Sequence, residues 1–398
     1  MMMSSGDGIS MVSMDRAFEL VDELRERFYS ILPVEKIPIK GSFNRRLSSD
    51  MVAARRSPGF DMSTVDGYAV NVDDTFPLAI RAEIFAGATI DRPLSKGETA
   101  FVATGARLPD GSNAVIKFED VLIEDGRLSA VMPPAWESVI RAGSDFEPGD
   151  VIIKRGSMIT PSLIGLVHAS GNTEVEVYKK IRVGVIATGD EIKNGMVPDT
   201  NTPVICAMLR NWGCEPIEMG IAGDTPEEVR AMFEKSIDLC DVVITVGGVS
   251  VGKKDYVPLI TGNDRNVLFR GYRVRPGKPL MVSTYKGRPV FSLPGKPAGS
   301  FTAMELIVKR FILGRPGGLC VEMPLSSDVE VPGGWDSIVY VRIVDGKVSP
   351  IINQDTYPDA KKYNITVMSA SPCTIVADGF FTACKDIRAG EIVKINMI

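Results

Sequence analysis

The chain has 398 residues, of which 44% are hydrophobic and 24% charged, and its formal net charge is −5. This length predicts two to four domains of a globular protein. The acidic balance gives no reason to expect nucleic acid as the main partner. The sequence has no apolar run of about 18 residues, which argues against a membrane span, and its N-terminus lacks a signal-peptide pattern. We therefore expect a cytoplasmic location.

The cysteine and histidine content limits the possible chemistry. Six cysteines form no C-x-x-C pair, so we expect reduced thiols and no disulfides. His168 is the only histidine, which excludes His-rich zinc sites and any Ser–His–Asp triad built on another residue. It lies in an expected helix capped by Thr160, where we favour a structural role for it. Catalysis would have to rest on carboxylates, lysines, backbone amides or an oxygen-bound metal.

The N-terminal half begins with helical patterns and then changes character. Residues 13–32 have apolar side chains at helical spacing and Ser13 as a cap, which predicts an amphipathic helix. We expect a second helical piece at 49–55. Residues 70–140 alternate short β-type runs with turns such as Asp125-Gly126. They predict a small all-β module inserted between two parts of another domain.

From residue 181 onward, apolar strands alternate with helices. We expect strands at 181–187, 216–222 and 242–246, and helices at 203–212 and after the cap at Thr225. This alternation predicts right-handed crossovers and a doubly wound parallel sheet.

The sheet should continue through a hairpin, after which the chain returns to β structure. The hairpin comprises residues 280–284 and 289–293, and a Pro-Gly-Lys-Pro loop flanks it on each side, at 276–279 and 294–297. A helix at 299–313 and a linker at 315–318 should follow. The last 80 residues are short alternating strands, with 339–352 the clearest hairpin. They predict a small barrel or sandwich.

The strand ends of this sheet hold the candidate site, because ligands bind at the carboxyl ends of parallel strands. Glu191, Asp224 and Asp255 follow three successive strands, and Asp255 closes a loop that contains three glycines, 247–252. Alone, the loop fits a tight turn equally well, and Asp190 and Asp224 could each be helix caps. Together with the lysines of the two proline loops, the acids predict a pocket for a phosphate-bearing ligand with Mg²⁺. The residues by themselves name no reaction.

Five segments resemble, in order, the signatures of the molybdopterin molybdenumtransferase family, which also includes the C-terminal part of gephyrin. The segments are SPGFDMSTVDGYAV (57–70), TGDEI (188–192), GGVSVGKKDYV (247–257), RVRPGKPLMV (273–282) and FSLPGKPAGS (291–300). The resemblance covers essentially the whole chain.

The resemblance implies a multi-domain α/β and β fold in an elongated subunit that forms homodimers. The implied domains are a discontinuous N-terminal domain (1–47 and 140–178), an inserted β domain (48–139), a doubly wound α/β molybdopterin-binding domain (179–317) and a C-terminal β-barrel (318–398). The active site would lie in a cleft between subunits, where the α/β domain of one faces the S-x-x-D-G-Y-A region of the other.

The implied reaction is the last step of molybdenum cofactor biosynthesis. Metal from molybdate or tungstate enters the dithiolene of adenylylated molybdopterin, with Mg²⁺ as cofactor and AMP as product. Four positions match the family's catalytic residues: Asp66, Glu191, Asp255 and Lys278. The implied substrate-binding residues are Thr104, Asp145, Asp224, Gly247, Gly248, Ser250, Gly252, Arg275, Pro294 and Pro297. The implied Mg²⁺ ligands are Glu191, Asp224 and Asp255.

Three positions depart from the family pattern. Arg275 stands where Lys is usual, Lys296 stands where Asn is usual, and Lys253-Lys254 replaces a less basic pair. An arginine fork is not equivalent to a compact ammonium at an anion site. We expect a more cationic pocket, with a shifted preference between tungstate and molybdate, or a paralogue with altered activity.

Two alternatives remain open. The chain could be a non-catalytic, gephyrin-like scaffold or molybdopterin-binding protein, although a scaffold has no need of the converging charges of Asp66, Glu191, Asp255 and Lys278. It could also adenylylate molybdopterin, an activity that would use only 181–315 and leave the flanking domains unexplained.

Overall fold

The computed structural model describes five stretches of the chain: residues 11–88, 92–249, 266–314, 319–351 and 376–398. The chain divides into two compact units. One unit consists of Met1–Pro33 and Lys179–Ile398, and the other of Val34–Tyr178. The division into four domains stays a prediction.

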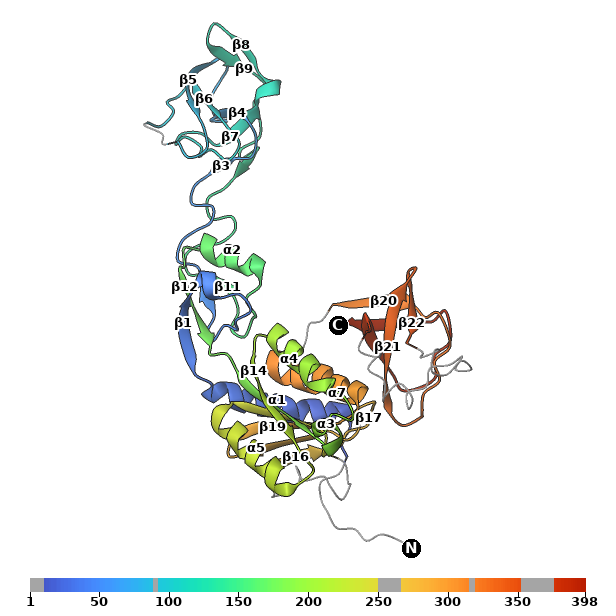
Figure 1. Ribbon diagram of the computed structural model, residues 1–398. Coiled ribbons are helices and arrows are strands. Elements are labelled where there is room, and N and C mark those ends of the chain that lie inside the picture. Colours follow the sequence, from blue (N-terminus) through green and yellow to red (C-terminus); the bar gives the residue numbers. More distant parts are fainter. Residues whose placement is uncertain (1–10, 89–91, 250–265, 315–318, 352–375) are drawn as a thin grey trace. The chain divides into compact units, whose positions relative to one another are not determined.

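A six-stranded sheet, here called the α/β sheet, organises the first unit (Figure 1). Its strand order is β14-β13-β15-β19-β18-β16, and the first four strands are parallel. The strands are β13 (Arg182–Thr188), β14 (Glu215–Ala222), β15 (Val242–Val246), β16 (Val267–Arg270), β18 (Met281–Tyr285) and β19 (Arg288–Leu293). The predicted parallel sheet and its hairpin are confirmed, with the hairpin adding an antiparallel edge.

Helices cover both faces of the α/β sheet, as the doubly wound prediction requires. The helices are α3 (Asp190–Lys193), α4 (Asn201–Asn211), α5 (Pro226–Leu239), α7 (Pro297–Ala303), the π-helical η4 (Met304–Val308) and α8 (Lys309–Leu313). Val229 and Phe233 of α5 pack with Ile186 and Val243 on one face. Figure 1 shows α4 and α7 on the opposite side. Burial of apolar side chains on both faces explains why every residue of β15 is buried.

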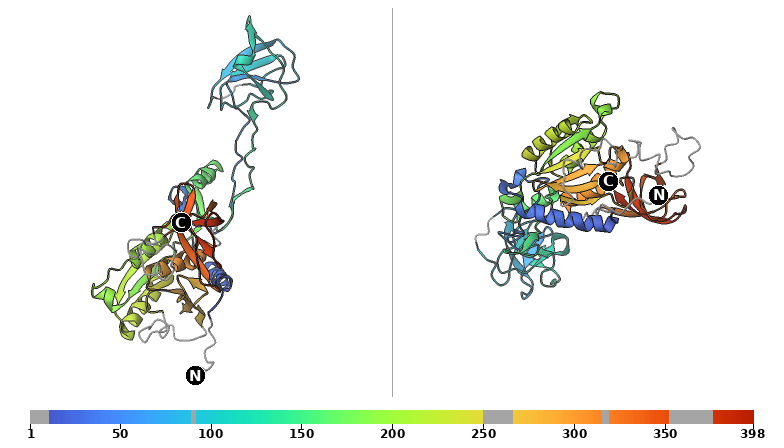
Figure 2. Two further views of the ribbon diagram at one scale, coloured as in Figure 1. Left: turned by 90° about the vertical axis from the view of Figure 1, so that its right-hand side faces the viewer. Right: turned by 90° about the horizontal axis from the view of Figure 1, so that it is seen from below.

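The N-terminal helix α1 (Met14–Ile31) belongs to this unit and confirms the first predicted helix, with Ser13 as its N-cap. It lies alongside α8 (Figure 2). The rings of Phe28 and Phe311 are 5.2 Å apart, and Arg310 donates two hydrogen bonds to Asp22, of 2.8 and 2.6 Å. The apolar stripe of α1 therefore completes the core on that side.

The C-terminal sheet is the second sheet of this unit and forms a half-barrel around its own apolar core. Its order is β17-β21-β23-β24-β20, and β22 pairs with β21. The strands are β17 (Val274–Arg275), β20 (Cys320–Pro324), β21 (Asp336–Val344), β22 (Lys347–Pro350), β23 (Gly379–Ala383) and β24 (Ile392–Met397). The predicted hairpin is confirmed, and it turns at Asp345 and Gly346, which both have positive φ. The edge strand β17 comes from the segment just before the first Pro-Gly-Lys-Pro loop.

The second unit contains the insertion sheet, of order β7-β4-β6-β5-β9-β8. Its strands are β4 (Gly67–Val70), β5 (Leu78–Ile84), β6 (Glu98–Val102), β7 (Ala114–Lys117), β8 (Leu122–Glu124) and β9 (Arg127–Ser129), with η2 (Phe118–Asp120) after β7. The predicted turn at Asp125-Gly126 joins β8 and β9, with φ of 48° and 71°.

Three two-stranded sheets and a helix make up the rest of the second unit. They are β1 (Val34–Pro38) with β12 (Glu174–Tyr178), β2 (Met51–Val52) with β11 (Val151–Ile153), β3 (Met62–Ser63) with β10 (Val139–Ile140), α2 (Pro161–Ala169), and the short η1 (Ile39–Gly41). Thr160 caps α2 as expected.

The helical piece expected at 49–55 is wrong, because this segment contains β2. The N–H groups of Ala53 and Ala54 donate to the carbonyls of Asp150 and Ser170, both at 2.9 Å. These distant partners replace the local hydrogen bonds of a helix. The helices expected at 203–212 and 299–313 start two residues earlier, at Asn201 and Pro297.

The remaining sequence-level expectations concern thiols and membranes. The cysteines in the described ranges are all free: Cys206, Cys214, Cys240, Cys320 and Cys384. The expected linker at 315–318 lies outside the described residues. Among the helices of the described ranges, none combines the length and the apolar character that crossing a membrane requires.

Gly67, the glycine of the S-x-x-D-G-Y-A segment, lies where its strand passes close to the neighbouring β7. A Cβ at this position would lie 2.1 Å from the carbonyl oxygen of Ile116. We predict that Gly67→Ala destabilises the insertion sheet by about 3 kcal/mol, because backbone must move to relieve the clash. Hydrogen exchange of the β4, β6 and β7 amides measures the loss.

Gly59→Ala is the matched control, because a Cβ at Gly59 would meet nothing within 4 Å. We expect its effect to stay within about 0.5 kcal/mol. Unchanged amide protection in Gly67→Ala would contradict the close packing of β4 against β7.

Candidate functional site

A cavity of about 840 Å³ opens at the carboxyl ends of the parallel strands. The loops that follow β13, β14, β15 and β19 contribute to its wall, and so does the segment between β17 and β18. Seven of the residues predicted for the site line this cavity: Glu191, Asp224, Gly247, Gly248, Arg275, Lys278 and Pro294. Their convergence is what the topology of an open α/β sheet predicts.

The floor of the cavity is built from glycines. A Cβ on Gly247, whose φ is +93°, would lie 2.7 Å from Oγ1 of Thr188. A Cβ on Gly295 would lie 3.6 Å from the Cα of Gly247, and one on Gly299 would lie 3.5 Å from the Cα of Gly277. The loops after β15 and β19 and the first proline loop therefore pack backbone against backbone.

Glu191 and Asp224 supply the negative charge of the cavity. Glu191 lies in the short α3, and its carboxylate occupies the space beside Gly189, where a Cβ would lie 2.7 Å from Oε1. Asp224 is half-buried in the loop after β14. Its backbone N–H donates to Oδ1 of Asp190 at 3.0 Å. Neither Asp190 nor Asp224 is a helix cap, because Gly189 and Thr225 hold those positions.

The helix start at Thr225 also fixes the neighbouring loop. Thr225 Oγ1 accepts from the N–H of Glu228, as the predicted cap requires. Glu228 does not return this bond to Thr225; its carboxylate accepts from the N–H of Gly223 at 2.9 Å and from Lys193. The hydrogen bond from Lys193 and then that from Gly223 lower the pKa of Glu228. This charge therefore stabilises the loop that precedes Asp224.

Three cations line the same cavity as these acids. Arg275 and Lys278 belong to the first proline loop and Lys296 to the second, and all three line the cavity. Arg275 is half-buried, whereas Lys278 and Lys296 are exposed. Two of the three departures from the family pattern, Arg275 and Lys296, thus lie on the cavity wall. Lys296 adds a positive charge there, whereas Arg275 keeps the charge of a lysine and changes its shape.

Asn201 is a cavity residue that sequence reasoning missed. Its side-chain N–H donates to the carbonyl of Gly295 at 2.8 Å, which fixes the second proline loop. The carboxylate of Asp199 accepts from the N–H groups of Asn201 and Thr202 at 3.1 and 3.0 Å. An acid three residues before Thr202 is a helix-start signal, and it explains why the helix begins before Pro203.

Several predicted residues lie elsewhere. Pro297 is not among the residues that line the cavity; it is the first residue of α7. Ser250, Gly252 and Asp255, with the Lys253-Lys254 pair, lie outside the described residues. His168 is exposed on α2. In the described ranges, no group of three or more His, Cys, Asp or Glu side chains could hold a metal ion.

The three predicted residues of the second unit make two separate contacts. Oδ1 of Asp66 accepts from the N–H of Thr104 at 2.7 Å and from its hydroxyl at 2.9 Å. These two bonds, the backbone one first, lower the pKa of Asp66. Asp145 accepts from the hydroxyl of Ser57 at 2.9 Å. Ser57 is the first residue of the 57–70 segment, so the fold ties Asp145 to that segment.

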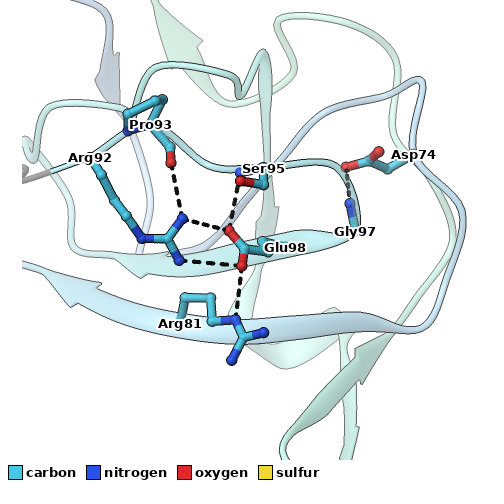
Figure 3. A network of polar contacts seen from close by, with 7 residues as sticks. All are labelled: Asp74, Arg81, Arg92, Pro93, Ser95, Gly97 and Glu98. Atoms are coloured by element: carbon cyan, nitrogen blue, oxygen red, sulfur yellow. Dashed lines mark hydrogen bonds and ion pairs between the residues drawn. The ribbon is translucent and has the colours of Figure 1, made fainter.

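Arginines of the insertion sheet are partly engaged by a carboxylate (Figure 3). Glu98 accepts from Arg92 at 3.0 and 3.2 Å and from Arg81 at 3.0 Å. It also accepts from the N–H of Ser95 at 3.1 Å. These bonds, led by that from Arg92, lower the pKa of Glu98 to about 2. The guanidinium groups of Arg81 and Arg92 are therefore already paired with a carboxylate of their own sheet.

Comparison with known proteins agrees with this architecture. Residues 12–171 match the family model described as the MoeA N-terminal region (domain I and II), and residues 184–314 match that of a probable molybdopterin binding domain. The chain is 30% identical over 308 residues to the molybdopterin molybdenumtransferase of Haemophilus influenzae, covering 73% of this chain and 76% of that protein. The chain belongs to the molybdopterin molybdenumtransferase family.

Two further members of the family extend the match to the whole chain. The molybdopterin molybdenumtransferase of Bacillus subtilis is 29% identical over 393 residues, covering 92% of this chain and 90% of that protein. The crystal structure of the molybdopterin biosynthesis moeA protein of Pyrococcus horikoshii OT3 superposes with a TM-score of 0.80 at 25% identity, covering 98% of this chain and 100% of that one. The family thus accounts for both units.

The hydroxyl of Thr104 provides one of the two hydrogen bonds that hold Asp66 ionised. We predict that Thr104→Val raises the pKa of Asp66 toward the ordinary aspartate value, because the backbone N–H then acts alone. In the folded protein this lowered pKa favours folding at neutral pH, and the contribution is lost as the pH falls through it. Carboxyl-detected NMR titration measures the change. Thr99→Val is the control, because it removes a hydroxyl that donates to the carbonyl of Ala69 in the same sheet, and it should leave the pKa of Asp66 unchanged. An unchanged pKa of Asp66 in Thr104→Val would contradict the role of the Thr104 hydroxyl.

Proposed function

We propose that this transferase binds adenylylated molybdopterin and molybdate or tungstate in the cavity of the α/β sheet, inserts the metal into the dithiolene and releases AMP. The observation that carries the proposal is the meeting of two carboxylates, three cations and glycine backbone in one cavity of about 840 Å³. That volume suits a ligand of two or more rings. Membership of the family supports the same reaction as the last step of molybdenum cofactor biosynthesis.

The positive wall suits the chemistry of AMP release. When water attacks the anhydride, a new P–O bond forms, the bond between the two phosphates breaks, and AMP leaves as a phosphate monoester with additional negative charge. Fixed cations stabilise such charge most where they are already in place and water is partly excluded. Arg275 and Lys278 would take this role toward phosphate, and the oxyanion would bind close to them.

The acidic wall suits Mg²⁺, which binds carboxylate, phosphate and water oxygens. Glu191 and Asp224 would hold the ion, together with Asp255. The space left by the missing Cβ of Gly189 is filled by the carboxylate of Glu191, which keeps a hard oxygen ligand at the cavity wall. When bound, Mg²⁺ would neutralise phosphate charge and orient the anhydride.

The predicted residues of the second unit would act through dimer formation. We place Asp66, Thr104 and Asp145 of one subunit at the active site of a second subunit in a homodimer. Ser250, Gly252 and Pro297 would complete the substrate-binding loops. The proposed location of the protein is the cytoplasm.

The direct test incubates the purified protein with adenylylated molybdopterin, Mg²⁺ and molybdate or tungstate. We predict AMP release that depends on the oxyanion, and a loss of at least about 100-fold in Glu191→Gln, because the negative charge that would hold Mg²⁺ is lost. Glu227→Gln, an acid on α5 that does not line the cavity, should keep activity. Binding of the substrate without AMP release by the native protein would favour the scaffold alternative.

The same assay tests the shared active site. Asp66→Asn and Glu191→Gln, each inactive alone, should regain up to about a quarter of native activity when the two are unfolded and refolded together. Heterodimers would contain one intact site if the two residues come from different subunits. Failure of the mixture to exceed the separate variants would contradict the homodimeric site and leave the AMP-release assignment standing.

The two departures on the cavity wall, Arg275 and Lys296, should set the anion preference. We predict that Lys296→Asn weakens binding of both oxyanions about tenfold, because a charge-assisted hydrogen bond is lost. Arg275→Lys should change the ratio of the tungstate and molybdate dissociation constants, because fork geometry is lost while charge is kept. Isothermal titration measures both, with Lys235→Asn on the exposed side of α5 as control. Unchanged affinity and selectivity in both variants would contradict this explanation of the departures.

A further inference from the structure

Trp335 of the C-terminal sheet lies against the first proline loop, which lines the cavity. It is half-buried and directly precedes β21. β21 pairs in parallel with β17, in the register Val274 to Asp336 and Arg275 to Ser337. The N–H of Asp336 also donates to the carbonyl of Arg273 at 2.9 Å. The backbone of the first proline loop is therefore anchored to the C-terminal sheet at the point where the loop enters the cavity.

The Trp335 ring contacts both cations of this loop. The guanidinium carbon of Arg275 lies 4.2 Å from the ring centroid, and Nζ of Lys278 lies 5.5 Å from it. Both residues line the cavity. In the part of the chain that the structure describes, no ion pair joins either cation to a carboxylate. The aromatic face is thus the electron-rich group that these two side chains share.

The Trp335 ring offsets the repulsion between the two cations of the loop and limits their side-chain motion. Two cations within four residues repel each other, and their long side chains sample many rotamers in the absence of a partner. The negative face of an indole attracts both and leaves their N–H groups able to donate to an anion. An anion that arrives then meets donors that are already in place, and binding loses less side-chain entropy.

We propose that Trp335 is a positioning residue that preorganises Arg275 and Lys278 for a tetrahedral oxyanion or phosphate. The proposal rests on the proposed function, and it makes the C-terminal sheet part of the active site through one side chain. Another role for a half-buried indole at a cavity would be stacking on a ring of the nucleotide or pterin. The closeness of the guanidinium to the ring argues against that role, because Arg275 already covers part of the ring.

The test compares binding of tungstate alone with binding of AMP, by isothermal titration of the full-length protein. Trp335→Leu should weaken tungstate binding on the order of tenfold, because the cation–π attraction is lost while apolar volume is kept. Trp335→Phe should stay within about threefold of the native protein, since a weaker aromatic face remains. In the transfer assay, Trp335→Leu should raise KM for molybdate and leave kcat at saturating molybdate within about twofold.

The controls separate positioning from folding. Trp136→Leu removes a matched Arg–Trp contact in the second unit, where Arg141 lies 4.5 Å from the ring centroid, and should leave tungstate binding unchanged. In an Arg275→Met background, Trp335→Leu should have a smaller effect than in the native background, since the partners act together. A purely structural role would give equal effects in both backgrounds.

The outcomes also separate this inference from the proposed function. Equal tungstate affinity in Trp335→Leu and the native protein, with AMP release intact, would overturn the positioning role alone. Weaker AMP binding with unchanged tungstate binding would overturn it in favour of ring stacking. Failure of the native protein both to bind tungstate and to release AMP would overturn the proposed function, and the positioning role with it.

Discussion

The cavity depends on glycines at the points where its loops cross. Gly247 approaches Thr188 so closely that a side chain would overlap its hydroxyl, and its backbone also faces Gly295. Gly277 and Gly299 make a second backbone contact beside it. These contacts bring the carboxyl ends of the parallel strands and both proline loops to one floor. The acids and cations of the wall can face a common ligand only because this floor leaves no room for side chains between the loops.

The electrostatics of the wall follow from how each charge is held. The carboxylates of Asp190 and Glu228 accept hydrogen bonds from backbone N–H groups of the loop after β14. Their charges therefore stabilise the fold. Glu191 and Asp224 remain at the cavity surface. Arg275 and Lys278 are held by an aromatic face from the C-terminal sheet. One set of charges therefore holds the loops in place, and another lines the cavity where substrate would bind. The C-terminal sheet contributes through the aromatic ring that lies against Arg275 and Lys278.

Much of this architecture could be predicted from the sequence because the signals are local. Ser13, Thr160 and Thr225 cap helices where expected, and strand-end topology placed Glu191 and Asp224 together. The failures involve long-range contacts. Residues 49–55 read as helical, but the N–H groups of Ala53 and Ala54 find partners about 100 residues away. The sequence around Trp335 gave no signal, because its contact with Arg275 exists only once β17 has paired with β21.

In the proposed function, the cavity of the α/β sheet binds the oxyanion through the cations of its two proline loops. Anomalous X-ray scattering from crystals soaked in tungstate tests it most directly. We predict a tungsten peak inside the cavity, with oxyanion oxygens within hydrogen-bonding distance of Arg275 or Lys278, and loss of that peak in crystals of Lys278→Met. A tungsten site elsewhere on the molecule, with the cavity empty under the same conditions, would contradict the account.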